Sequence, residues 1–264
     1  MTLLSARYTK YLKLALALIA AIAVAAHSNE PPDSNSSIYI DSENPMRDVQ
    51  IALDKARSTD KLLLVVMGAQ WCHDSRGLAE KFEDPDVAAV LLDNYETVIV
   101  NVGYFKDLRS ISQRFDQAHY FSTPTVMIID ASTERLINGQ DMHIWGSAGR
   151  LPTSKYVDYF TTYANTPSPV FVPLPEAHAA AIADFEQANA QRLGSAYELL
   201  VPGMKLEDNT GEASDGFIEQ WREVQRYRTR LQEEIRSIRQ QAVAAPDKPL
   251  SFPSYAAFSW EGQY

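Results

Sequence analysis

The sequence GAQWCHDS at residues 68–75 follows the apolar run KLLLVVM at residues 61–67 and precedes a helical pattern. This order predicts a buried strand that passes directly into the first turn of a helix. Cys72 lies at the junction, where unpaired backbone N–H groups and the positive end of a helix dipole favour an anion. The thiolate is the reactive form of cysteine, so the position favours a nucleophilic Cys72. The alternative is a small, buried hydrophobic residue.

Cys72 is the only cysteine among the 264 residues. It can form no internal disulfide, so any disulfide chemistry needs a sulfur atom from another molecule. The five histidines show no spacing typical of metal ligands, and one cysteine does not supply a zinc cluster. We therefore expect neither a metal nor a cofactor. A papain-like pairing of Cys72 with His119 or His143 is an alternative that no local motif supports.

The N-terminal segment has the pattern of an export signal. Basic residues precede an apolar run at residues 14–26 (LALALIAAIAVAA), which ends in small residues. This is typical of a cleaved signal peptide at residues 1–26, because a membrane-spanning helix needs about 20 apolar residues. An uncleaved membrane anchor is the alternative. We expect an oxidising compartment, the bacterial periplasm, and a flexible polar leader at residues 27–37.

Apolar runs alternate with helical patterns along residues 38–165, which predicts one α/β domain with a mixed sheet covered on both faces. Pro85 should kink the helix after Cys72 or divide it in two. The segment WGSAGR at residues 145–150 is expected to be a turn before the last helix. The expected strands cover residues 38–40, 61–67, 97–102, 126–129 and 135–138, and the expected helices begin at Pro45, after Cys72, near Leu108 and at Ser154.

With Trp71-Cys72 at the second strand-to-helix junction and Thr123-Pro124-Thr125 before a later strand, this order resembles the thioredoxin superfamily. The resemblance covers roughly residues 38–163 and implies a three-layer, thioredoxin-like fold. It is closer to the C-terminal domain of the periplasmic, membrane-spanning thiol:disulfide interchange reductases. The residues that carry this closer resemblance are GAQWC at 68–72, Phe82, DPDV at 84–87 and the Thr-Pro-Thr segment.

The resemblance implies a role for each matching residue. Cys72 falls on the attacking cysteine, and Trp71 falls on the aromatic residue that shields it. Pro124 falls on the cis-proline beside the active sulfur, and the backbone of Thr123 would pair with a bound peptide as an added strand. An alternative for both Trp71 and Pro124 is that they only maintain the fold.

The departures from the family pattern limit the chemistry. Ser75 stands where redox-active members carry the resolving cysteine, so a mixed disulfide on Cys72 must be released by another thiol. Val66 stands where many thioredoxins carry a buried acidic residue, which removes the usual internal proton acceptor. Within the motif, a protonated His73 would stabilise a thiolate, whereas Asp74 would oppose it.

The last hundred residues lie outside this resemblance. Residues 166–175 predict a proline-rich linker, and residues 176–245 predict an antiparallel helical hairpin with a loop at 201–214. The hairpin either packs on the first domain or on a second copy of itself, or it docks a protein partner. The tail, residues 246–264, is unusually aromatic for a disordered segment. It either packs back across the domain or binds elsewhere as a peptide-like segment.

Two functions are compatible with these features. The first is monothiol thiol-disulfide exchange with protein or small-molecule thiols and disulfides, at a site that comprises Cys72, His73, Ser75, Trp71, Thr123 and Pro124. The second is a thioredoxin-fold module that binds a peptide or protein partner without electron transfer. The net charge of -10 argues against nucleic acid as a partner. Membrane contact is expected only if the signal segment stays uncleaved.

Overall fold

The protein is described by a computed structural model that covers residues 37–169 and 171–261. The predicted signal peptide lies outside the described residues, as does the predicted leader apart from Ser37. The last three residues of the predicted tail lie outside them too. Among the described helices, none combines the length and the apolar character that a membrane span requires.

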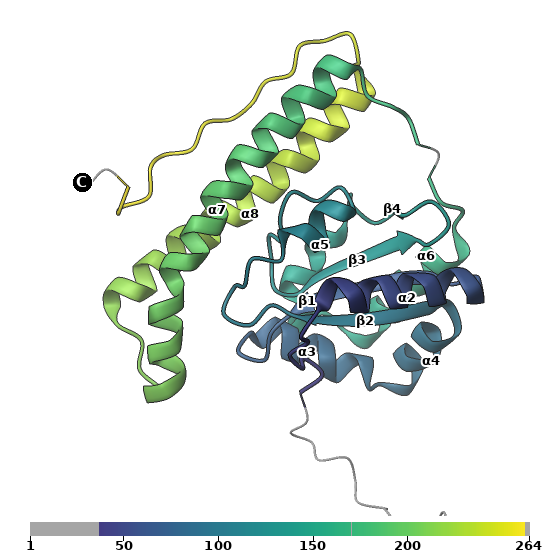
Figure 1. Ribbon diagram of the computed structural model, residues 1–264, viewed down its shortest axis with the longest axis horizontal. Helices are drawn as coiled ribbons and strands as arrows, with labels where there is room; N and C mark the ends of the chain where they lie inside the picture. The colour runs from purple at the N-terminus through teal and green to yellow at the C-terminus, as the bar shows by residue number, and fades with distance from the viewer. Residues whose placement is uncertain (1–36, 170, 262–264) are drawn as a thin grey trace, which may run out of the picture. The chain divides into compact units, whose positions relative to one another are not determined.

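A mixed sheet of four strands, in the order β2-β1-β3-β4, forms the centre of the N-terminal part (Figure 1). The central strand β1 (Leu62–Gly68) pairs in parallel with β2 (Tyr95–Asn101) and antiparallel with β3 (Thr125–Asp130). The last six residues of β1 are buried, as expected for a continuous apolar strand with both faces covered. The short edge strand β4 (Arg135–Leu136) completes the sheet.

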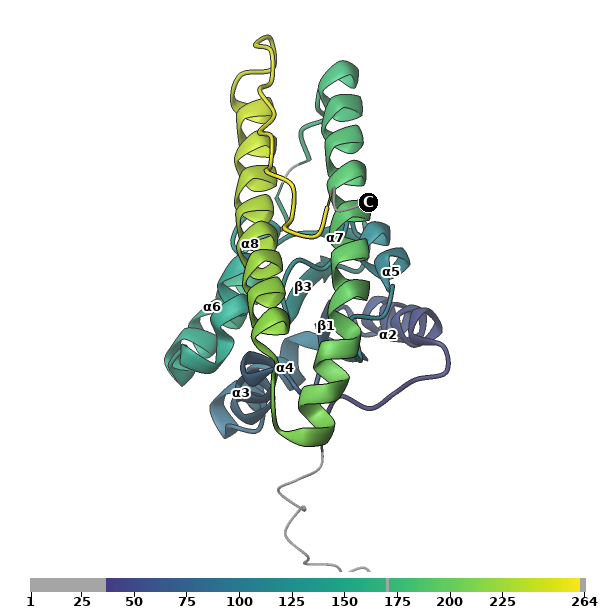
Figure 2. The ribbon, with the colours of Figure 1, turned by 90° about the vertical axis from the view of Figure 1, so that its left-hand side faces the viewer.

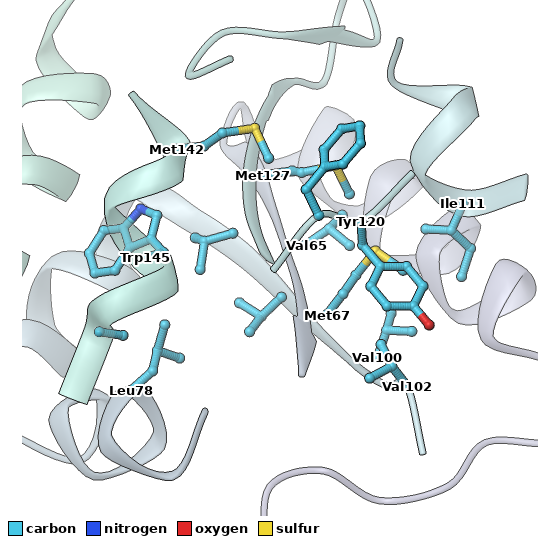
Figure 3. Packing of buried hydrophobic residues seen from close by; sticks show 14 of the residues in the cluster. Val65, Met67, Leu78, Val100, Val102, Ile111, Tyr120, Met127, Met142 and Trp145 are labelled. Atoms are coloured by element: carbon cyan, nitrogen blue, oxygen red, sulfur yellow. The ribbon is translucent and has the colours of Figure 1, made fainter. Parts of the chain in front are cut away.

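Helices cover the two faces of this sheet. Buried side chains of β1, β2 and β3 meet Leu78 and Trp145 on one side and Ile111 and Tyr120 on the other (Figure 3). Helix α2 (Pro45–Thr59) precedes β1. The helices that come later in this part of the chain are α3 (His73–Phe82), α4 (Pro85–Asn94), α5 (Arg109–Arg114), the 3-10 helix η1 (Met142–Arg150) and α6 (Thr153–Asn165).

Local signals set the ends of several helices. Asn44 caps α2 by accepting a hydrogen bond from the backbone of Arg47, and Pro45 occupies the first helical turn. The helix after Cys72 is divided in two, with Asp84 as the cap of α4 and Pro85 as its first residue. Proline fits this first position because it has no N–H to leave unpaired.

Two predicted elements of this domain are wrong. Residues 38–40 form no strand, because the segment is held by the buried side chain of Tyr39, whose hydroxyl donates to the carbonyl of Ser75 (3.0 Å). Residues 145–150, predicted as a turn, belong to η1. This helix forms because the fully buried ring of Trp145 stacks on Phe160 of α6 (ring centroids 5.2 Å apart), which gives the segment an apolar anchor.

The predicted strand at residues 135–138 is only half formed, because the side chain of Asn138 replaces the backbone ladder. Asn138 Oδ1 accepts from the backbone N–H of Ile128 (2.8 Å), and Nδ2 donates to the carbonyl of Val126 (2.9 Å). These two groups belong to β3 on the side that faces β4. The amide thus meets the hydrogen-bonding needs of β3 beyond the two-residue strand.

The C-terminal region forms the predicted hairpin of two helices, α7 (Glu176–Thr210) and α8 (Asp215–Ala244), which lie side by side (Figures 1 and 2). The loop predicted at 201–214 is wrong, since α7 continues through Pro202 to Thr210. Tertiary packing overrides the proline here: Gly203 lies so close to α8 that a Cβ atom would be 2.2 Å from the ring of Phe217. The chain turns instead at Gly211, whose φ is 74°.

The hairpin packs on the sheet domain through aromatic rings. Tyr197 of α7 stacks on Phe105 (ring centroids 4.0 Å apart), and Trp221 of α8 lies edge-on to Trp71 (5.8 Å). Packing on the first domain is therefore the interpretation that holds for the hairpin, and the two regions share one hydrophobic core.

The described part of the tail packs on the hairpin. The ring of Phe252 lies 5.1 Å from Phe185 of α7, and that of Tyr255 lies 5.0 Å from Tyr227 of α8. Aromatic side chains thus hold a segment that has almost no regular secondary structure.

The close approach of α3 to η1 makes a prediction about stability. A Cβ atom on Gly77 would lie 2.5 Å from Gly149 Cα, a backbone atom that no rotamer change can move. We expect Gly77→Ala to lower the free energy of unfolding by about 1–3 kcal/mol, measured by urea denaturation. The control is Gly216→Ala, because Gly216 has no atom within 4 Å of an added Cβ. It should be neutral or stabilising. Equal stability of the two variants would contradict the prediction.

Candidate active site

Cys72 occupies the predicted junction between strand and helix. It is the N-cap residue of α3, with extended backbone angles (φ -81°, ψ 122°), and its N–H donates to the carbonyl of Ala69 (3.1 Å). The turn at residues 70–71 separates it from the end of β1. Its side chain is 9% exposed. The sulfur atom therefore lies at the helix N-terminus, where the sequence placed it, but it is largely covered.

The sulfur of Cys72 contacts the loop that precedes β3. Cys72 Sγ donates to the carbonyl of Thr123 (3.0 Å), and the peptide bond between Thr123 and Pro124 is cis. The loop is held by its own hydrogen bonds, since Ser122 Oγ donates to the carbonyl of Pro124 (3.0 Å) and Thr125 Oγ1 donates to that of Ser122 (2.7 Å). The structure thus brings Cys72, Thr123 and Pro124 together from loops far apart in sequence.

Trp71 is anchored to the loop after β2 and to the hairpin. Its Nε1 donates to the carbonyl of Gly103 (2.7 Å), in the loop after β2. Its ring lies edge-on to Phe105 (5.1 Å) and to Trp221 of the hairpin (5.8 Å). Sequence reasoning missed the contribution of Trp221, because nothing in the local pattern of α8 indicates which loop it meets.

Ser75 and His73 have different environments. The hydroxyl of Ser75 is fully buried and accepts from the backbone N–H of Ala69 (3.3 Å), so it braces the loop before Cys72. His73 is exposed on the first turn of α3. Asp74 has a role that sequence reasoning missed, because its Oδ1 accepts from the backbone N–H of Gly149 (3.0 Å) and ties α3 to η1. Such a contact across 75 positions leaves no local signal.

Val66, His119 and His143, which the sequence analysis also discussed, do not contact the Cys72 side chain through hydrogen bonds in the described part of the chain. Val66 is a core residue of β1, paired with Ile99 and Val126. In the part of the chain that the structure describes, the hydrogen bonds of His119 and His143 do not involve Cys72. Nor do residues 37–169 and 171–261 contain a group of three or more His, Cys, Asp or Glu side chains that could hold a metal ion.

Thr123, whose carbonyl contacts the sulfur, has a side-chain oxygen with no hydrogen-bond partner. Thr123 is 3% exposed, and its Oγ1 is among four buried side-chain atoms of the described residues that make no hydrogen bond. An unpaired buried hydroxyl costs about 1–3 kcal/mol, so such an atom is a candidate for contact with a ligand. The sequence pointed to the backbone of Thr123, whereas the structure adds its side chain.

Comparison with known proteins agrees with this geometry. Residues 44–131 match the family model described as thioredoxin-like. The chain contains a thioredoxin-like domain. The crystal structure of disulphide isomerase from Xylella fastidiosa Temecula1 is also similar, with 22% sequence identity and a TM-score of 0.44, over 49% of this chain and 98% of that chain. No curated protein matches the chain.

The family-model match and the arrangement of strands and helices confirm the fold class expected from the sequence. The thioredoxin-like domain has a mixed four-stranded sheet with helices on both faces, and a helical region follows it. The candidate site lies just after the end of β1. The resemblance to the thioredoxin superfamily implies an attacking cysteine at this position.

His119 supports the loop that reaches Thr123. It is buried, its Nδ1 lies 3.1 Å from the carbonyl of Tyr120, and its ring lies edge-on to Tyr197 of α7 (5.3 Å). Burial lowers the pKa of His119 to about 4, although the contact with the Tyr120 carbonyl acts in the opposite direction. The ring is therefore neutral at pH 7 and donates its Nδ1 proton to that carbonyl.

This shift predicts a loss of stability in mild acid. The unfolded chain protonates this ring near pH 6.5, whereas the folded chain does so only near pH 4, so the unfolded state binds more protons between these values. We expect the free energy of unfolding to fall by about 1–2 kcal/mol between pH 7 and pH 5 on account of His119. His119→Asn, which keeps a donor but does not titrate, should lose less in urea denaturation at the two pH values. An equal loss in both proteins would refute the assignment.

Proposed function

We propose that this protein carries out monothiol thiol-disulfide exchange through Cys72. The supporting observation is the position of Cys72, which carries the only sulfhydryl group of the sequence. Cys72 lies at the N-terminus of α3, and its Sγ is 3.0 Å from the carbonyl oxygen of Thr123, the residue that precedes the cis bond to Pro124. A thiolate at this position receives the partial positive charge of the helix end. The family match over residues 44–131 supports a redox role of this kind.

The exchange takes two steps. The thiolate of Cys72 attacks one sulfur of a disulfide R–S–S–R, the S–S bond breaks, and R–S⁻ leaves with the electron pair of that bond. Cys72 then carries a mixed disulfide, Cys72–S–S–R. A second thiolate, R′–S⁻, attacks the sulfur of R, which forms R–S–S–R′ and returns the Cys72 thiolate. Ser75 cannot perform the second step, because a hydroxyl group forms no disulfide.

The other site residues would act on this exchange without reacting. Thr123 Oγ1 is free to donate a hydrogen bond to an incoming or leaving sulfur, and exposed His73 can approach an anionic reactant. Trp71 would keep one side of the sulfur dry. A periplasmic location, which the N-terminal sequence predicts, would supply disulfides as substrates, and thiols would have to come from a reducing partner.

A binding module without electron transfer is a second candidate. The observation that favours it is the low exposure of Cys72, at 9%, because a reactive sulfur must be reached by its substrate. In that case no disulfide probe forms an adduct with Cys72 in the folded protein.

Adduct formation tests the proposal. Incubation of the reduced protein with 2-hydroxyethyl disulfide should add one hydroxyethylthio group, visible by intact-mass spectrometry, and Cys72→Ser should add none. The wild-type adduct should persist until an external thiol is added, because no internal thiol is available to release it. Absence of a wild-type adduct would favour the binding module.

The position of the missing resolving thiol gives a further prediction. Ser75→Cys should release the hydroxyethylthio group as an internal disulfide forms, at least about tenfold faster than wild type loses it. Ser112→Cys is the matched control, since Ser112 is equally buried but lies on α5 and should leave the adduct in place. An adduct that persists equally in both variants would show that position 75 is not the resolving position.

A further inference from the structure

Helix α8 contacts the thioredoxin-like domain at several points along its length. Near its start, Trp221 contacts Trp71 and Phe105 (ring centroids 5.8 Å apart in both pairs). Further along, Arg236 Nη1 lies 2.6 Å from His143 Nδ1, and Arg239 donates to a carboxylate oxygen of Asp116 (2.6 Å). The helix therefore contacts the domain from Trp221 to Arg239, a rise of about 27 Å along its axis.

The loop before β3 is buried under this arrangement. Phe121 and Thr123 are each 3% exposed, and Phe121 lines a cavity whose wall also includes Gln232 and Ile235 of α8. The neighbouring carbonyl of Tyr120 accepts a hydrogen bond from the hydroxyl of Tyr197 of α7 (3.3 Å). A peptide that added a strand beside Thr123 would have to enter the space between this loop and the hairpin.

We infer that α8 occupies the surface on which an extended peptide would pair with Thr123, so that the site exchanges low-molecular-weight disulfides and thiols rather than disulfides within polypeptides. Trp221 is the specificity-determining residue, because it closes the end of this surface next to Trp71. The inference rests on the proposed exchange at Cys72. It assigns the hairpin a function that the thioredoxin-like domain alone does not have.

A small reactant has another approach. Next to Cys72 in the first turn of α3, His73 and Arg76 are exposed, and among the described residues no ring contact or hydrogen bond joins either of them to α8. The Arg76 side chain donates to the carbonyls of Gln70 and Trp71 (2.8 and 3.0 Å), so it is held beside the loop rather than across the sulfur. The exposed first turn of α3 is thus the side from which a small reactant would approach Cys72.

The test compares two disulfides with the same leaving group. The first is 2-hydroxyethyl disulfide. The second is a peptide of about ten residues, which in extended form is long enough to span the covered surface. Its central cysteine carries a hydroxyethylthio group in a mixed disulfide. The rate of adduct formation on Cys72 is divided, for each probe, by the rate at which free N-acetylcysteine reacts with the same probe. This normalisation removes the difference in intrinsic reactivity between the two probes. Wild type should prefer the small probe by at least about tenfold, because the rate of exchange depends on access to the sulfur.

Substitutions of Trp221 test whether its side chain excludes the peptide. Trp221→Ala should raise the rate with the peptide at least about tenfold and change the rate with the small probe by less than about threefold. Phe252→Ala is the matched control, since it removes a half-buried aromatic ring that packs on Phe185 away from the site, and it should change neither rate. Trp221→Leu, which keeps an apolar side chain, serves as a second variant if thermal unfolding shows that Trp221→Ala loosens the hairpin.

The outcomes separate the two hypotheses. If Cys72 forms no adduct with either probe, the proposed exchange fails and this inference fails with it. If wild type reacts with both probes at equal normalised rates, exchange stands and the selection by size is overturned. If wild type selects the small probe but neither Trp221 variant admits the peptide, the assignment of Trp221 is overturned.

Discussion

The antiparallel pairing of β1 with β3 determines where the sulfur of Cys72 lies. In the register of this pair Met67 stands opposite Thr125, so the chain leaves β1 toward Cys72 at the same end where it enters β3 from Thr123. The hydrogen bond from Cys72 Sγ to the Thr123 carbonyl closes the gap between the two loops. A shift of one residue would turn every side chain of β1 to the opposite face and separate these loops. The candidate site is thus a consequence of sheet register.

Aromatic packing then joins the hairpin to this site. Trp71, Phe105, Tyr197 and Trp221 come from four separate segments, yet their rings form one connected group. Because the hydrophobic core extends across both regions, the helices belong to one packed unit with the sheet domain, and Trp221 contacts Trp71, the neighbour of Cys72 in sequence. At the other end, Arg239 donates to both Asp116 and the buried carboxylate of Glu186, which fixes the direction of α8 over the domain.

Most of the thioredoxin-like domain could be predicted from the sequence, because its signals are local. The apolar run of β1, the prolines at positions 45 and 85 and the Thr-Pro-Thr segment each act within a few residues, and they also locate Cys72, Thr123 and Pro124. The predictions that were wrong or missing concern residues whose structure depends on partners far away in the sequence. Pro202 is a local signal for a break in α7, but the packing of Gly203 against Phe217 outweighs it. The roles of Trp221 and Asp74 likewise come from contacts that no spacing in the sequence encodes.

The amide of Asn138 has a consequence for association between molecules. Beyond the two residues of β4, the outer hydrogen-bonding groups of β3 would otherwise be open to another chain, and an open edge is a template for uncontrolled strand addition. Asn138 Oδ1 and Nδ2 occupy the N–H of Ile128 and the carbonyl of Val126, and its Nδ2 also donates to the hydroxyl of Tyr159, which holds the amide in place. A single side chain therefore protects this part of the β3 edge from strand addition by another molecule.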